Sequence, residues 1–193
     1  MRDQKKRIVI APDSFKGTMT AIEVCRIIRK AFLQVDSALE ICCLPMADGG
    51  EGTVDAFLSA LGGERKTVRV HGPLFAMHNA SFGILKDGTA ILEMAAAAGL
   101  PLAGKDANPM YTTTFGVGEL IRAALDAGCR KIRVGAGGSA TTDGGIGCLT
   151  ALGARFTDKT GEEVPPMGCG LSRVACINLD GLDERLREAD VTV

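Results

Sequence analysis

The chain has 193 residues, of which 46% are hydrophobic but only 4% aromatic, and its 25 glycines indicate many tight turns. Its formal net charge of −1 argues against binding to nucleic acid or to an anionic membrane, because both partners favour a basic surface. The seven cysteines form no Cys-x-x-Cys pair, so we expect reduced thiols, and the two histidines lack metal-ligand spacing, so we expect no zinc site. No stretch resembles a signal peptide or a membrane span, and we therefore expect a cytoplasmic protein.

The first 64 residues alternate strands and helices in the way that begins a doubly wound α/β sheet. Residues 7–11 form a short β-branched run typical of a buried parallel strand, and a helix is predicted from about residue 18 or 20 to residue 34. Thr20 and Glu23 have the spacing of a capping box at the start of that helix. Two further elements follow, a strand over residues 40–44 and a helix over residues 53–61.

The pattern changes near Glu64, where we place a domain boundary. Successive strands are then predicted over residues 66–71, 80–85 and 90–93, with a hairpin turn at residues 86–88. The later elements are a helix over about 116–127, a strand over 131–134, a helix over 146–152 and a short amphipathic piece over 183–188. Residues 189–193 have the pattern of half a strand, which predicts that the chain is a fragment of a longer protein.

Polar, glycine-rich segments follow the first two predicted strands. Residues 13–16 (Asp-Ser-Phe-Lys) lie where open α/β sheets bind ligands, although a helix-entry turn with a solvated Lys16 explains them as well. Residues 48–53 (Asp-Gly-Gly-Glu-Gly-Thr) occupy the equivalent place after the second strand. Their three glycines exceed what a helix cap needs, so we expect a ligand to approach this backbone closely.

A third segment, residues 135–145, holds five glycines, three hydroxyls and one carboxylate between a strand and a helix. Backbone N–H groups and a helix N-terminus in this arrangement predict a cup for a phosphate or a carboxylate. The segment lacks the Gly-Lys-Ser/Thr ending of a Walker loop and the acidic partner of a dinucleotide fingerprint. Thr141, Thr142 and Asp143 could cap the helix, or they could bind phosphate oxygens and orient a metal.

Taken together, these segments resemble the glycerate kinase family in its bacterial two-domain form. The matching stretches are residues 8–16, 45–53, 93–100, 108–109 with 112–119, and 137–145. The sequence departs mildly from the family pattern at residues 17–19, where Gly-Thr-Met replaces Glu-Ser-Leu, and at Thr142, where Asn is common. Family members also continue beyond this point, with a Thr-Gly-Glu-Gly-like motif and the strands that complete the first domain.

The resemblance implies an enzyme that phosphorylates D-glycerate with ATP and Mg²⁺, commonly at the 2-hydroxyl. It also implies a flavodoxin-like α/β domain, of which residues 1–64 would be the first part, and a second α/β domain with a mixed, barrel-like sheet over residues 65–193. The expected partners are glycerate and a nucleotide, without nucleic acid or membrane. The oligomeric state stays open, a homodimer included.

Phosphoryl transfer requires held phosphates, a neutralising cation and an oriented hydroxyl. We expect Lys16 to stabilise the transferring charge, and either Asp13 or Asp48 to accept the glycerate proton while the other could hold the metal. Arg65, Arg69 or a residue outside this chain could bind the glycerate carboxylate. The predicted binding residues are Ser14, Gly49, Gly50, Glu51, Gly137, Gly138, Ser139, Ala140, Thr141, Thr142 and Asp143.

Two alternatives remain from the sequence. The anion cup could belong to a sugar-phosphate isomerase or phosphatase, an enzyme of another class. The chain could also be a truncated, non-catalytic fragment that binds anions, because its first domain would be incomplete.

Overall fold

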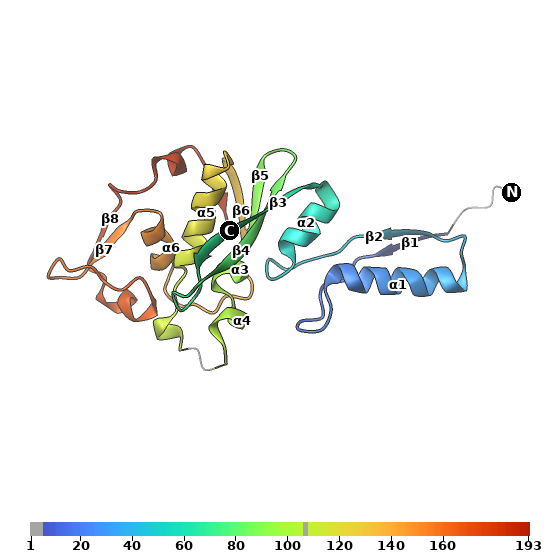
Figure 1. Ribbon diagram of the computed structural model, residues 1–193, viewed down its shortest axis with the longest axis horizontal. Coiled ribbons are helices and arrows are strands. Elements are labelled where there is room, and N and C mark those ends of the chain that lie inside the picture. Colours follow the sequence, from blue (N-terminus) through green and yellow to red (C-terminus); the bar gives the residue numbers. More distant parts are fainter. Residues whose placement is uncertain (1–5, 106–107) are drawn as a thin grey trace.

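The computed structural model describes residues 6–105 and 108–193, so residues 1–5 of the predicted first domain lie outside the described part. It shows an α/β protein in which a small strand–helix–strand unit extends from a larger body (Figure 1). The larger body is built on a five-stranded mixed sheet. The α/β class predicted from the sequence is therefore confirmed, and a barrel-like curvature of the sheet stays a prediction.

The small unit consists of β1 (Arg7–Ile10), α1 (Ala21–Val35) and β2 (Glu40–Cys43). The two strands are parallel and form a sheet of their own. The predicted capping box is confirmed: Thr20 Oγ1 accepts the Glu23 N–H at 3.2 Å, and the Glu23 carboxylate accepts the Thr20 N–H at 2.8 Å. These bonds satisfy N–H groups that have no partner inside the first helical turn.

The larger body contains β3 (Gly63–His71), β4 (Met77–Leu85), β5 (Thr89–Glu93), β6 (Lys131–Gly135) and β9 (Asp190–Thr192), which are neighbours in that order. The first three strands form an antiparallel meander, and its second turn is the hairpin predicted at residues 86–88. β6 pairs parallel with both β5 and β9. The half-strand predicted at residues 189–193 is therefore a strand, and β6 is its neighbour.

Helices cover both faces of this sheet. The larger body contains the helices α2 (Thr53–Leu61), α3 (Met94–Ala98), α4 (Leu100–Ala103), α5 (Phe115–Asp126) and α6 (Ile146–Ala151), of which α2, α3 and α5 contact the sheet. Leu92 of β5 packs in the main core with Leu120 of α5, whereas its neighbour Ile91 packs with Val54 of α2. Because successive residues of a strand face opposite sides, α5 and α2 lie on opposite faces of the sheet.

The packing of α2 differs from what the predicted domain boundary near Glu64 implies. The sequence pattern assigned α2 to the first domain, which was expected to end near Glu64. In the structure, α2 contacts β4 and β5 through Val54 and Leu58, so the change in packing occurs before α2 rather than after it. The division at residue 64 stays a prediction.

The C-terminal third contains elements that the sequence pattern missed. β7 (Arg155–Thr157) and β8 (Cys176–Asn178) form an antiparallel pair, and η2 (Gly168–Arg173) is a 3₁₀ helix between them. Two other 3₁₀ helices in the described residues are η1 (Pro109–Tyr111), which precedes α5, and η3 (Glu184–Arg187), which lies within the amphipathic piece predicted at residues 183–188. Within the described residues, the seven cysteines are all free, and no helix combines the length and hydrophobicity needed to cross a bilayer.

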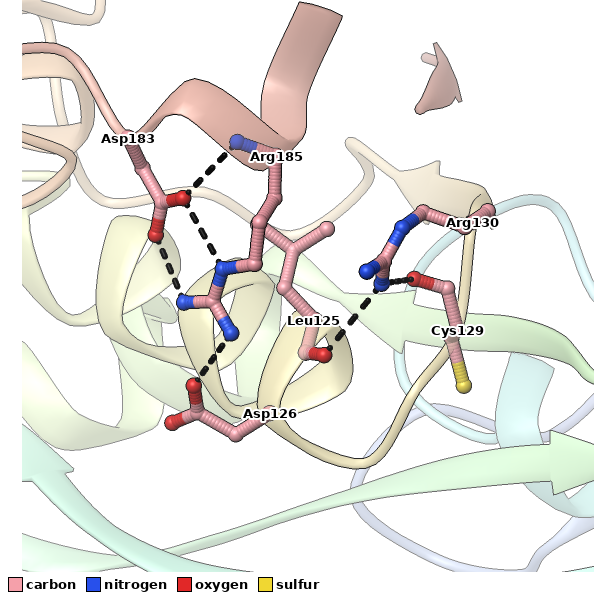
Figure 2. A network of polar contacts seen from close by, with 6 residues as sticks. All are labelled: Leu125, Asp126, Cys129, Arg130, Asp183 and Arg185. Atoms are coloured by element: carbon pink, nitrogen blue, oxygen red, sulfur yellow. Dashed lines mark hydrogen bonds and ion pairs between the residues drawn. The ribbon is translucent and has the colours of Figure 1, made fainter. Parts of the chain in front are cut away.

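The segment around η3 is attached to the end of α5 by a network of charges (Figure 2). Arg185 donates to Asp183 and, at 2.7 Å, to Asp126 on the last turn of α5. Nearby, Arg130 donates to the carbonyl oxygens of Leu125 and Cys129. These bonds hold the chain that leads into β9 against the larger body.

Candidate active site

The predicted site begins at the carboxyl ends of β1 and β2, where the two following loops run together. The Leu44 N–H donates to the Ile10 carbonyl at 2.8 Å, and the Met46 N–H donates to the Pro12 carbonyl at 2.9 Å. Lys16 Nζ and Asp48 Oδ2 are consequently 3.8 Å apart, with exposed side chains. Such a pair contributes little to stability, which leaves both groups available to a ligand.

The loop of residues 48–53 is folded by its own polar groups. Asp48 Oδ1 accepts the Gly50 N–H at 3.0 Å, and Thr53 Oγ1 donates to the Gly50 carbonyl at 2.8 Å. Gly49 and Gly52 have φ angles of 89° and 95°, a region that favours glycine. The other Asp48 oxygen, Oδ2, faces Lys16. Glu51 is exposed in the same loop.

This loop meets the third predicted segment through main-chain atoms. The Gly137 N–H donates to the Gly49 carbonyl at 3.0 Å. A Cβ at Gly135 would collide with the Gly49 carbonyl, and a Cβ at Gly137 would lie 2.6 Å from the Gly50 nitrogen. The sequence pattern attributed the glycines to a nearby ligand. At these positions, close packing of the two loops accounts for them.

Residues 137–144 also run beside the junction of α3 and α4. The Gly138 carbonyl accepts the Leu100 N–H, and the Ala140 N–H donates to the Ala98 carbonyl. The hydroxyl groups of Ser139 and Thr141 lie 2.8 Å apart. In the described part of the chain, the N–H groups of Gly138, Ser139 and Gly144 donate to no protein acceptor, so these groups remain for an anion.

Asp143 is placed differently from the rest of the predicted set. Its side chain is 1% exposed, and its Oδ2 accepts the N–H and the hydroxyl of Thr114, both at 2.8 Å. The Gly145 and Gly147 N–H groups donate to the same carboxylate at 3.1 and 3.2 Å. The first turn of α6 is thus satisfied by Asp143 and does not point at a ligand. Asp143 anchors α5 and α6 to the loop rather than lining a cup.

The other predicted residues have varied surroundings. Asp13 is exposed and accepts the N–H of half-buried Ser14 at 2.6 Å. Ala140 is buried, and the exposed Thr142 donates to the Pro109 carbonyl at 3.3 Å. Arg65 is ion-paired with Asp55 of α2, which leaves the exposed Arg69 as the better candidate for a carboxylate.

Glu93, at the carboxyl end of β5, is a residue that the sequence analysis did not assign. Its Oε1 accepts the Val54 N–H at 2.7 Å, at the start of α2. Burial raises the pKa of this carboxyl, while the bond from the Val54 N–H opposes the rise. Its place in the sequence, a carboxylate at the end of an otherwise apolar strand, is the pattern from which Glu93 could have been identified. Glu93 fixes the end of the loop that carries Asp48.

The two histidines were given no role from the sequence. His71 donates its backbone N–H to Glu119 at 2.7 Å, and its Nδ1 lies 2.9 Å from the same carboxylate. Phe75 and Phe115 flank the ring. The Nε2 atom of His78 is buried and has no partner in the described part of the protein.

Comparison with known proteins assigns this arrangement to a family. The model of the glycerate kinase family matches residues 8–193. The chain belongs to the glycerate kinase family. It is 48% identical over 189 residues to a glycerate kinase of Bacillus subtilis (strain 168), with 97% of this chain and 50% of the relative covered. It is 45% identical over 189 residues to a glycerate 2-kinase of Escherichia coli (strain K12), with the same coverage.

A solved structure agrees with this membership of the glycerate kinase family. A crystal structure described as glycerate kinase 2 from Salmonella typhimurium LT2 matches with a TM-score of 0.82 and 45% identity. The match covers 96% of this chain and 51% of that chain. The chain therefore spans about half the length of these members of the glycerate kinase family.

The Mg²⁺ that the glycerate kinase family implies can be tested against the donors present. Within residues 6–105 and 108–193, no three Asp, Glu, His or Cys side chains gather as metal ligands. Mg²⁺ in kinases usually takes one or two carboxylates and completes its shell with water and phosphate oxygens. The exposed carboxylates of Asp13 and Asp48 both fit this requirement, whereas the Asp143 carboxylate already accepts four hydrogen bonds.

Proposed function

We propose that this chain carries the phosphate-binding and catalytic loops of an enzyme that phosphorylates D-glycerate with ATP, giving 2-phosphoglycerate. The observation that carries the proposal is the Gly49–Gly137 hydrogen bond, which places the Lys16–Asp48 pair beside a loop with free N–H groups. A cation, a carboxylate and N–H donors are the parts that phosphoryl transfer requires. Membership of the glycerate kinase family supplies the substrate class.

In this proposal, one set of groups binds the ATP phosphates and Lys16 acts on the phosphoryl group that is transferred. The N–H groups of Gly138, Ser139 and Gly144 bind the ATP phosphates, and the hydroxyls of Ser139 and Thr141 add donors. Lys16 stabilises the charge on the transferring phosphoryl group. A glycerate hydroxyl oxygen forms the new bond to the γ-phosphorus, the bond from that phosphorus to the ADP oxygen breaks, and the hydroxyl proton passes to a carboxylate.

Asp48 is our choice for the proton acceptor, with Asp13 as the alternative. Each carboxylate holds its own turn through Oδ1, but Asp48 also faces the Lys16 ammonium group through Oδ2. The carboxylate that does not take the proton is the expected ligand of Mg²⁺, which would neutralise phosphate charge when bound. We propose Arg69 as the contact for the glycerate carboxylate and the cytoplasm as the site of action.

The test is an assay of D-glycerate phosphorylation with ATP and Mg²⁺, applied to the chain and to its variants. Asp48→Asn should lower turnover by about 10²–10⁴-fold, the range for loss of a general base. Glu184→Gln changes an exposed carboxylate on η3, outside the proposed site, and is the matched control. Equal turnover of the chain and Asp48→Asn would reject the role of Asp48.

The half-length match gives a second candidate function, a non-catalytic fragment that binds anions. Calorimetry with Mg²⁺ and ATP separates the two candidates. ATP binding without glycerate turnover would favour the fragment. Hydrolysis or isomerisation of a sugar phosphate in the absence of ATP would instead identify an enzyme of another class.

A further inference from the structure

Two cysteines of the unit of β1, α1 and β2 lie between the helix and the strands. Cys25 of α1 is 3% exposed, and its thiol donates to the Ile10 carbonyl at 3.8 Å. Ile10 is the partner in register of Cys43 on β2, so their side chains project to the same face of the two strands. The Cys43 thiol donates to the Cys25 carbonyl, also at 3.8 Å. The two thiols therefore meet on the face that α1 covers.

The other cysteines of the chain are placed differently, although all of them are free thiols. Cys42 precedes Cys43 in β2 and consequently points to the opposite face of the strand. Cys129 packs in the main core, and Cys176 is exposed on β8. Burial raises the pKa of the Cys25 thiol, and the neighbouring Cys43 thiol raises it further. Cys25 and Cys43 are thus the thiols placed to form a covalent link between α1 and β2.

The pair is also accessible to a small reagent. Cys25 and Cys43 both line a groove of about 690 Å³ that runs along α1 beside β2. The half-buried Cys43 is the more exposed of the two thiols. The same groove contains Arg26, Arg29 and Lys30, whose positive charges attract an anionic reagent. A low-molecular-weight disulfide that carries carboxylates has the size and the charge for this groove.

We propose that Cys25 and Cys43 form a reversible redox site, which such a disulfide converts into an intramolecular disulfide bond between α1 and β2. Cys43 reacts first because it is the more exposed thiol. Its sulfur gives up its proton to water and bonds to one sulfur of the reagent, whose S–S bond breaks, and the released thiolate takes up a proton. Cys25 then loses its proton to solvent, and its sulfur bonds to the Cys43 sulfur and displaces the second reagent thiol. The two protein thiols are oxidised, and one reagent disulfide is reduced to two thiols.

The bond would join the elements next to the Lys16–Asp48 pair. α1 begins after the loop that contains Lys16, and β2 ends before the loop that contains Asp48. A covalent link between Cys25 and Cys43 limits the separation of α1 from β2, so it reduces local opening of this unit. The proposal concerns these two thiols and does not depend on which reaction the site performs.

The test treats the reduced 193-residue chain with oxidised glutathione in native buffer and maps its disulfides by mass spectrometry without reduction. The bridge between Cys25 and Cys43 should exceed every other pairing at least ten-fold and should disappear when dithiothreitol is added. Deuterium exchange of the α1 amides should become at least ten-fold slower on oxidation and should recover on reduction. A chain that carries only mixed disulfides with glutathione would overturn the proposal.

Two variants at adjacent positions of β2 complete the design. Cys43→Ser should abolish the bridge and leave the Cys25 thiol free, whereas Cys42→Ser should form the bridge at the rate of the wild type. Circular dichroism before oxidation checks that each variant is folded, and the disulfide map of the wild type tests the pair without either variant. A bridge from Cys25 to Cys42 in the wild type would overturn the proposal, as would equal loss of the bridge in the two folded variants.

Discussion

Asp143 is a carboxylate in a glycine-rich loop that serves the fold. Its two oxygens accept three N–H groups and one hydroxyl, which come from the starts of α5 and α6. A buried carboxylate is tolerated when several donors compensate the loss of water. The helix ends therefore hold the loop in place, and the free N–H groups of Gly138 and Ser139 are held with it.

We expect Asp143→Ala to lower the free energy of unfolding by about 3 kcal/mol, because several buried donors would lose their acceptor together. Urea unfolding followed by circular dichroism measures this change. Thr142→Ala removes one long hydrogen bond from an exposed neighbour and should cost about 0.5 kcal/mol or less. Similar losses for the two variants would show that Asp143 does not anchor the helices.

Glu93 makes the stability of the folded protein depend on pH. Because burial raises the pKa of this carboxyl above its ordinary 4.5, the folded state binds the proton more tightly than the unfolded chain does. The stability contributed by Glu93 is consequently greatest at low pH and declines as the pH rises from 4.5 through the folded pKa.

Glu93→Gln should remove this decline, since the amide does not titrate and still offers an oxygen to the Val54 N–H. The free energy of unfolding of the wild type, minus that of the variant, should fall between pH 4 and pH 8. Urea titrations at intervals across this range provide the measurement, with Glu188→Gln as the exposed control. A difference that is constant with pH would argue that burial leaves Glu93 unaffected.

At the scale of elements, η3 and β9 depend on the charged network at the end of α5. Arg185 forms ion pairs with both Asp126 and Asp183, and it lowers the pKa of Asp183 to about 2. A carboxyl with a lowered pKa stabilises the fold above its ordinary pKa, here 3.8, and the benefit is lost as the pH falls towards 2.

Asp183→Asn should therefore destabilise the protein by about 1 kcal/mol near neutral pH, a modest figure because the pair is partly exposed. The difference from the wild type should vanish near pH 2. Hydrogen exchange of peptides covering residues 182–192 should be faster in the variant, whereas Glu184→Gln should match the wild type. A loss that persists unchanged at pH 2 would rule out the ion pair as its cause.

The elements that the sequence predicted correctly have strong local signals. The helix over residues 53–61 and the capping box of Thr20 depend on neighbours in the chain. β7 and β8 were missed because each has only three residues and neither lies in a longer alternating run, whereas β9 lies within the alternating run of residues 189–193. The packing of α2 on β4 and β5, like the burial of Asp143, depends on residues distant in the sequence, so local patterns did not reveal either.

At the scale of the molecule, the unit of β1, α1 and β2 extends from a body with an extensive core (Figure 1). Its two strands bury little apolar surface, whereas β5 is buried along its whole length. Local stability follows buried apolar contact, so the two parts should differ in how readily they open. The candidate site includes loops from both parts.

We expect backbone amides of β1 and β2 to exchange with deuterium at least ten times faster than those of β5 and β6 in this 193-residue chain. Exchange measured by mass spectrometry at neutral pH tests the difference. β7 and β8, also a two-stranded pair, provide an internal comparison that is close to the larger body. Equal protection of β1 and β5 would mean that the chain opens as one cooperative unit.

The main-chain contact between Gly49 and Gly137 restricts how this site can vary. Side chains at Gly135 and Gly137 would displace the opposing backbone, so substitution there would separate the loops rather than adjust their chemistry. Differences in substrate preference would have to arise from flanking positions, such as Ser139 or Glu51. In a directed-evolution library of this protein, gains in ligand specificity should therefore accumulate around the junction of the two loops and leave the junction itself unchanged.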